Sequence, residues 1–174
     1  LEETLRRCSL FTELGIRKIR VTGGEPLVRK GVTGLMTSLA RLPARPEVLL
    51  TTNGLVLAEH LTELKAGGIR RINLSMDSLQ AETWTEITRR KGFEKVRAAV
   101  DQVLEMGLGL KINVVVLPGI NDEEMPDFVE LTRHNPLTVR FIEPMPFDGA
   151  GKALEETIDG QEILRRLGGR FELN

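Results

Sequence analysis

Residues 19–26 read Ile-Arg-Val-Thr-Gly-Gly-Glu-Pro, a short strand rich in β-branched residues that ends in two glycines, a carboxylate and a proline. Two adjacent glycines let backbone N–H and C=O groups approach a ligand closely, and Pro26 fixes the direction in which the chain leaves the turn. Glu25 adds a negative charge that we expect to point into the gap. A glycine pair after a strand is usually only a turn, so a ligand-binding site here must be supported by residues elsewhere in the sequence.

Strand-like and helix-like segments alternate outward from this turn. Patterns typical of strands cover 17–22, 47–52, 70–76, 109–117 and 137–143, and helical patterns cover 1–14, 32–41, 56–66, 93–106 and 122–133. A further strand is expected to begin within 170–174. The alternation predicts a parallel sheet with right-handed crossovers, either a barrel or an open doubly wound sheet.

Polar and apolar side chains alternate on three of these strands. The polar positions are Arg20 and Thr22 on the first strand, Asn73 and Ser75 on the third, and Lys111 and Asn113 on the fourth. On an open sheet such positions can simply face water. On a curved sheet whose apolar face is covered by helices they would converge inside, where a polar ligand would satisfy their hydrogen bonds.

The composition limits the class of protein. The chain has 174 residues, of which 41% are hydrophobic and 28% charged, and a net charge of −1. These values suit one domain over 1–174 and give no basic excess for nucleic-acid binding. No apolar stretch reaches membrane-spanning length. Cys8 is the one cysteine, so the chain cannot form an internal disulfide or provide a zinc or iron–sulfur site from its own cysteines.

Five motifs in this order resemble one enzyme family. They are Gly23-Gly24-Glu25-Pro26, Thr51-Thr52-Asn53-Gly54, 73–79 (Asn-Leu-Ser-Met-Asp-Ser-Leu), Lys111-Ile112-Asn113 and 140–145 (Arg-Phe-Ile-Glu-Pro-Met). The order resembles the MoaA-type GTP 3′,8-cyclases of molybdenum-cofactor biosynthesis, within the radical S-adenosylmethionine (SAM) superfamily, and the resemblance covers nearly the whole chain. Separately, each motif has a plainer reading: Thr51–Gly54 as an Asn-Gly turn, 75–78 as a helix N-cap, and Met145 as a packing residue.

The resemblance implies a partial (β/α)6 TIM-like barrel, truncated at both ends, with SAM and GTP inside it. It implies SAM-binding roles for Gly24, Glu25, Ser75 and Met145, and GTP-binding roles for Arg20, Thr51 and Lys111. No residue of the chain is expected to be catalytic, because the cofactor carries the chemistry. None is expected to bind a metal, because Cys8 matches no cluster ligand of the family. The full-length enzyme would be a lyase that converts GTP to (8S)-3′,8-cyclo-7,8-dihydroguanosine 5′-triphosphate.

The family uses two [4Fe-4S] clusters, and the resemblance places their cysteines outside this chain. We therefore expect the 174 residues to be an incomplete core domain, without the first strand and its cluster loop or the C-terminal cluster segment, and to be inactive alone. The resemblance further implies a downstream cyclic pyranopterin synthase, and leaves a homodimer open. The compartment would be the cytoplasm in a prokaryote or the mitochondrial matrix in a eukaryote.

Two other interpretations remain at this stage. The chain could be another radical SAM enzyme that modifies a peptide or a cofactor, which would need Gly23–Pro26 but not Arg20 or Lys111. It could instead be a cluster-free β/α domain that binds a phosphorylated metabolite.

Overall fold

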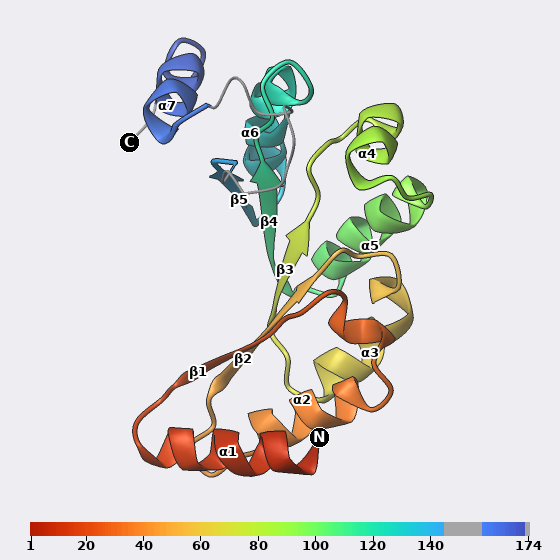
Figure 1. Ribbon diagram of the computed structural model, residues 1–174, viewed down its shortest axis with the longest axis vertical. Helices are drawn as coiled ribbons and strands as arrows, with labels where there is room; N and C mark the ends of the chain where they lie inside the picture. Colours follow the sequence, from red (N-terminus) through yellow and green to blue (C-terminus); the bar gives the residue numbers. More distant parts are fainter. Residues whose placement is uncertain (145–157, 173–174) are drawn as a thin grey trace, which may run out of the picture. The chain divides into compact units, whose positions relative to one another are not determined.

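The computed structural model describes residues 1–144 and 158–172, in which strands and helices alternate (Figure 1). The strands are β1 (Lys18–Val21), β2 (Glu47–Thr52), β3 (Arg71–Ser75), β4 (Gly109–Val115) and β5 (Leu137–Ile142). The helices are α1 (Glu2–Glu13), α2 (Val32–Ala40), α3 (Leu57–Ala66), α4 (Ala81–Thr88), α5 (Phe93–Glu105), α6 (Met125–His134) and α7 (Gly160–Gly168), with short 3-10 helices η1 (Pro26–Val28) and η2 (Asp122–Glu124).

The strands form one sheet in the order β1-β2-β3-β4-β5. The pairs β1–β2 and β2–β3 are parallel, and their register joins Val21 to Leu50 and Leu50 to Ile72. Strand order therefore follows chain order, as expected when each strand is followed by a helix that returns the chain to the next strand. This confirms the predicted α/β class and is consistent with a partial TIM-like barrel.

The chain divides into two compact units. Unit 1 comprises Leu1–Ser75 and Gly92–Lys111, and unit 2 comprises Met76–Lys91 and Ile112–Asn174. In unit 1 the helices pack in series, α1 against α2, α2 against α3, and α3 against α5, along one side of the strands (Figure 1). The prediction of one domain over 1–174 stays a prediction.

Each unit has its own hydrophobic core. In unit 1, Leu50, Leu61, Ile72 and Val100 are buried, and they come from β2, α3, β3 and α5. In unit 2, Val116, Met125, Ile158, Ile163 and Leu167 form one buried cluster. The core of unit 1 thus lies between its strands and helices, which leaves the other face of the strands for polar side chains.

Helix α5 shows why the pattern predicted this arrangement. Val96, Val100 and Val103 recur at helical spacing and are all buried, so the helix presents one apolar stripe to the core. Gly107 follows the C-cap residue Met106 with φ of 66°, a left-handed conformation that costs glycine little and ends the helix.

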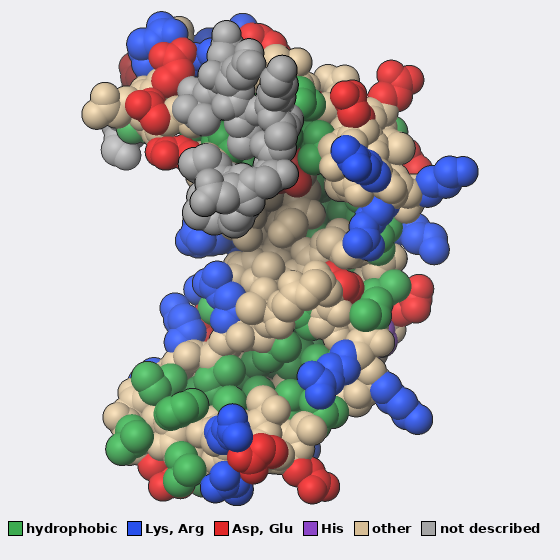
Figure 2. Space-filling view, in the orientation of Figure 1, with side chains coloured by type: hydrophobic (Ala, Val, Ile, Leu, Met, Phe, Trp, Pro, Cys, Tyr) green, Lys and Arg blue, Asp and Glu red, His purple; other side chains and the backbone are tan. Residues whose placement is uncertain are grey.

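Unit 1 also exposes several large apolar side chains. Leu10, Phe11, Leu14 and Ile16 are all exposed and lie in α1 or just after it, and Leu14 keeps 83% of its accessible surface. Figure 2 shows hydrophobic side chains gathered at the lower end of the view. None of the helices in the described part of the chain is long and apolar enough to span a bilayer.

Two helices, α4 and α7, were not predicted. The strand expected to begin within 170–174 is not present at 170–172, where the chain passes from a turn through a bend. Helix α4 buries only Trp84 and α7 buries only Ile163 and Leu167, so neither contains the long apolar stripe that identifies a helix from sequence.

Candidate functional site

Strand register places several predicted site residues on one face of unit 1. Arg20 is paired with Leu49 on β2, and Thr51, two residues further along β2, is paired with Asn73 on β3. Paired residues of parallel strands point to the same face, as do residues i and i+2 of one strand. Arg20, Thr51 and Asn73 therefore share a face, and so does Ser75.

Lys111 joins this group through the pairing of β3 with β4. The Gly109 N–H donates to the Arg70 carbonyl at 2.9 Å. In a parallel ladder this bond aligns Gly109 with Arg71, and so Lys111 with Asn73. Lys111 is half-buried there, whereas Arg20 is exposed. We call Arg20, Thr51, Asn73, Ser75 and Lys111 the polar face; it holds all three residues predicted to bind GTP.

The carboxylate of Glu25 joins two loops at the carboxyl ends of the strands. It accepts hydrogen bonds from the Asn53 N–H at 2.7 Å, the Thr52 hydroxyl at 2.9 Å and the Leu27 N–H at 3.1 Å. Glu25 was expected to point its charge into a gap; instead it contacts three donors of the protein itself. A carboxylate has about four acceptor positions, so it retains capacity for one further donor from a ligand.

The second loop is the Asn-Gly turn that the sequence indicates. The Asn53 side-chain oxygen accepts from the Leu55 N–H at 3.0 Å, and the Gly54 N–H donates to the Thr52 hydroxyl at 3.1 Å. Gly54 has φ of 83°, and a Cβ at this position would lie 2.6 Å from a methyl carbon of Leu74. The turn is therefore fixed by its own hydrogen bonds as well as by Glu25. By contrast, a Cβ at Gly24 would meet nothing within 4 Å, so space is open beside that residue.

The segment after β3 is not a helix cap. Helix α4 begins at Ala81, its N-cap residue is Gln80, and no side chain caps it. Asp77 instead accepts from the Val115 N–H at 2.8 Å, and burial raises the pKa of its carboxyl above the ordinary value, an effect that this hydrogen bond partly offsets. Ser78 donates to the buried carboxylate of Glu124. These contacts hold unit 2 together and leave Ser75 exposed at the end of β3.

Two buried polar atoms have no hydrogen-bond partner among the described residues. They are Thr51 Oγ1 in unit 1 and Asn113 Oδ1 in unit 2. Because most buried polar atoms in folded proteins are paired, each of the two indicates a place where a ligand or water would bind. Thr51 was predicted to contact a ligand. Asn113 was not assigned a role, although the alternation on its strand had marked it as polar.

All but one of the predicted site residues lie in the same unit of the described chain. Gly24, Glu25, Ser75, Arg20, Thr51 and Lys111 all belong to unit 1. Met145 lies outside the described residues. Residues 1–144 and 158–172 contain no group of three His, Cys, Asp or Glu side chains that could hold a metal ion, and Cys8 is half-buried in α1. The ligand set for an iron–sulfur cluster is therefore not found among the described residues.

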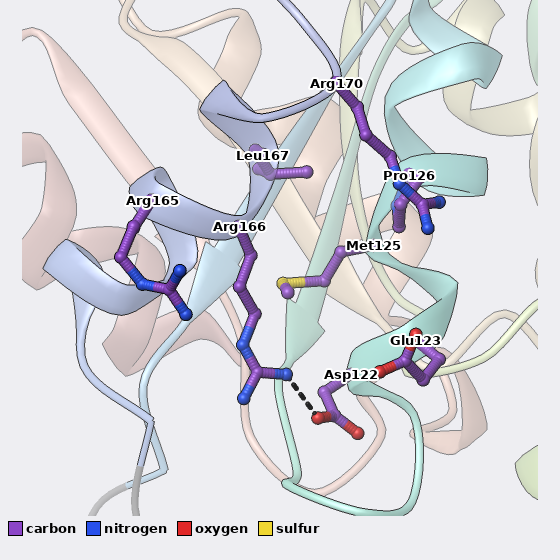
Figure 3. A pocket seen from close by; sticks show the side chains of 8 residues that line it. All are labelled: Asp122, Glu123, Met125, Pro126, Arg165, Arg166, Leu167 and Arg170. Carbon is purple, nitrogen blue, oxygen red and sulfur yellow. Dashed lines mark hydrogen bonds and ion pairs between the residues drawn. The ribbon is translucent and has the colours of Figure 1, made fainter.

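A separate pocket lies in unit 2 between η2, α6 and α7 (Figure 3). Its volume is about 380 Å³, and its lining includes Arg165, Arg166 and Arg170. Arg166 forms an ion pair with Asp122 at 2.7 Å, and both Arg165 and Arg166 bond Glu162, which lowers the pKa of that carboxyl to about 2. Two of the three arginines are thus neutralised by neighbouring acids, and no residue of this pocket was predicted to be functional.

Comparisons with known proteins match residues in both units. The family model described as the radical SAM superfamily matches residues 1–132. A GTP 3′,8-cyclase from Peptoclostridium acidaminophilum is 44% identical over 170 residues, which are 96% of this chain and 52% of the relative. A mitochondrial GTP 3′,8-cyclase from Arabidopsis thaliana is 41% identical over 170 residues, 97% of this chain and 44% of the relative. The chain spans about half the length of these curated relatives.

Solved structures are similar in fold. The crystal structure of Streptococcus suis SuiB superposes with a TM-score of 0.74 at 19% identity, over 96% of this chain and 38% of that one. At this identity the similarity concerns the fold alone. It supports the same partial barrel that the strand order and the single-sided helices indicate.

Proposed function

The chain belongs to the radical SAM superfamily, and on that premise we propose that it is part of a GTP 3′,8-cyclase, a lyase of molybdenum-cofactor biosynthesis. The observation that supports this most directly is the polar face, where Arg20, Thr51 and Lys111 lie on neighbouring strands. The relatives named GTP 3′,8-cyclase support the choice of reaction over other members of the superfamily.

GTP would bind along this polar face. Arg20 offers a planar group with several N–H donors and Lys111 a point charge, and both suit phosphate oxygens. The buried hydroxyl of Thr51, which has no partner among the described residues, would bond a neutral or anionic group of the nucleotide. In this role the strands hold the substrate in a fixed position, so that the reacting atoms meet in the right geometry.

SAM would bind at the carboxyl ends of the strands. Open space beside Gly24, one remaining acceptor position on Glu25 and the exposed hydroxyl of Ser75 fit the methionine end and the ribose of this cofactor. Met145 is proposed as a fourth contact. When bound, SAM supplies the radical chemistry of the superfamily. The described residues do not fit an iron–sulfur cluster, so we assign no step of the reaction to one.

The wider assignments are part of the same proposal. GTP would be the substrate, cyclic pyranopterin synthase would act on the product, and a homodimer is the oligomer we would test first. The compartment would be the cytoplasm in a prokaryote or the mitochondrial matrix in a eukaryote; the name of the Arabidopsis relative states that that protein is mitochondrial.

Thr51→Val tests the proposal because it removes the hydroxyl and keeps the shape of the side chain. The hydroxyl is buried and has no hydrogen-bond partner among the described residues, so we expect thermal stability to be kept or raised. GTP binding by the 174-residue chain, measured by calorimetry at low salt, should weaken by about 1 kcal/mol, or roughly five-fold.

Thr12→Val is the matched control. Thr12 is a buried residue whose hydroxyl donates to the Ser9 carbonyl in α1 at 2.7 Å, so this variant should lose stability and keep GTP affinity. Equal affinity of wild type for GTP and ATP would contradict the cyclase assignment. Equal GTP affinity in wild type and Thr51→Val would contradict the role of Thr51.

A further inference from the structure

The polar face continues toward the amino ends of the strands, where it carries charged side chains that do not belong to the family motifs. Lys18 lies two residues before Arg20 on β1 and is paired with Glu47. Arg71 lies two residues before Asn73 on β3 and is paired with Leu49 of β2. Leu49 is also paired with Arg20 on the neighbouring strand β1. Strand alternation therefore places Lys18, Glu47 and Arg71 on the same face as Arg20 and Thr51.

Glu47 connects two of these cations. Its Oε1 lies 3.2 Å from Arg71 Nη1, and its Oε2 lies 3.2 Å from Lys18 Nζ. All three side chains are substantially exposed, with 37% of the Glu47 side chain and 50% of the Arg71 side chain accessible to solvent. Ion pairs this exposed contribute little to stability, so a stronger anion can displace the carboxylate at small cost.

The positions of the cations suit a chain of phosphates. Arg20 and Arg71 flank Leu49 in one row across three strands, and Thr51, Asn73 and Lys111 form the next row. Neighbouring strands lie about 4.8 Å apart, so the two arginines start about 10 Å from each other across β2. Long side chains on both sides of such a gap can hold one extended anion through two-pronged hydrogen bonds.

We propose that Arg71 binds the phosphate chain of the nucleotide, and that Glu47 is its counter-ion when no nucleotide is bound. The inference rests on the proposed function and deepens it, because it adds a residue outside the family motifs to the substrate site. On binding, the phosphate oxygens replace the Glu47 carboxylate as acceptors for the Arg71 guanidinium, while Glu47 keeps Lys18. The alternative is a purely structural cross-strand ion pair.

The test compares Arg71→Gln with Arg70→Gln in the 174-residue chain. Arg70 is the adjacent arginine, exposed, with its guanidinium donating to the Lys65 carbonyl at 3.2 Å, so it is a matched control off the polar face. Calorimetry at low salt would use three probes: GTP, GMP and sodium tripolyphosphate. We expect Arg71→Gln to weaken GTP and tripolyphosphate binding about ten-fold and GMP binding less than two-fold, as the loss of one charged hydrogen-bond donor predicts. Arg70→Gln should change none of the three.

Glu47→Gln provides the opposite change at the same place. It removes the competing negative charge and should strengthen tripolyphosphate binding several-fold, with a steeper dependence on salt. Unchanged tripolyphosphate affinity in both Arg71→Gln and Glu47→Gln would overturn the inference and leave a structural ion pair. Tripolyphosphate binding that depends on Arg71, with GTP bound no more tightly than tripolyphosphate, would support the phosphate site and contradict the cyclase assignment. Absence of binding of all probes to wild type would contradict both.

Discussion

At the scale of single residues, the burial of Asp77 disfavours the charged form of its carboxyl. Its carboxyl is largely buried, with the Val115 N–H as its described donor, and burial raises its pKa. In the pH range between the ordinary pKa of aspartate and this raised pKa, the folded state binds more protons than the unfolded state. The free energy of unfolding therefore falls as pH rises through that range.

Asp77→Asn should remove this penalty. Asparagine keeps an oxygen that accepts from Val115 and cannot carry a charge, so we expect the variant to unfold at higher urea concentration than wild type at pH 7. The difference should shrink as pH is lowered through the raised pKa of wild-type Asp77, because the protonated carboxyl carries no charge to bury. Asp101→Asn, on the exposed surface of α5, is the control. A stability difference that stays constant from pH 4 to pH 7 would contradict this explanation.

At the scale of elements, α7 depends on charge at its first turn. Asp159 is its N-cap and accepts from the Glu162 N–H at 2.8 Å, while Glu162 bonds Arg165 and Arg166 one turn later. These two guanidinium groups lower the pKa of Glu162 from 4.5 to about 2. A carboxyl with a lowered pKa stabilises the folded state above its ordinary pKa, and this contribution is lost as pH falls from about 4.5 toward 2.

Glu162→Gln should therefore loosen α7 at neutral pH and not at low pH. Amide hydrogen exchange of 160–168, followed by NMR, should be faster in the variant at pH 6 and equal to wild type near pH 2. Because the pair is exposed, added salt should reduce the difference. Glu94→Gln, in the first turn of α5, tests whether any first-turn carboxylate has the same effect. Equal effects in the two helices would assign the stabilisation to the helix dipole instead of the arginines.

Sequence patterns predict elements better than they predict connections between elements. The alternation on 109–117 correctly predicted the period-two burial of β4, because such burial is a property of one strand alone. On β3, by contrast, Asn73 is buried together with its apolar neighbours Ile72 and Leu74. The role of Glu25 could not be predicted in this way, since two of its three donors, Thr52 and Asn53, lie 27 and 28 residues away. The alignment of Lys111 with Asn73 likewise requires the register between strands, which no single strand specifies.

At the scale of the whole molecule, the residues predicted to bind ligands gather in one compact unit of the described chain. The six predicted site residues within the described ranges belong to unit 1, and those ranges contain no candidate metal group.

We expect the 174-residue chain to bind no [4Fe-4S] cluster by itself. Such clusters take four cysteine ligands in the usual case, or three with one iron left open, and the chain has only Cys8. Anaerobic incubation with iron and sulfide, followed by desalting, should leave less than about one iron per chain and no absorption band near that of a cluster. Cys8→Ser should give the same result. Retention of about four irons per chain by wild type, lost in Cys8→Ser, would contradict the expectation.

The Asn53-Gly54 turn also affects the chemical stability of the protein in storage. Asparagine followed by glycine is chemically labile, because the unhindered glycine nitrogen can attack the side-chain amide, and such asparagines are among the residues that heat damages first. Here the Gly54 nitrogen donates to Thr52 and the Asn53 side chain accepts from Leu55, so neither group is free to turn toward the other. Deamidation at this site should therefore proceed through the unfolded chain, and its rate in storage would record how often unit 1 opens.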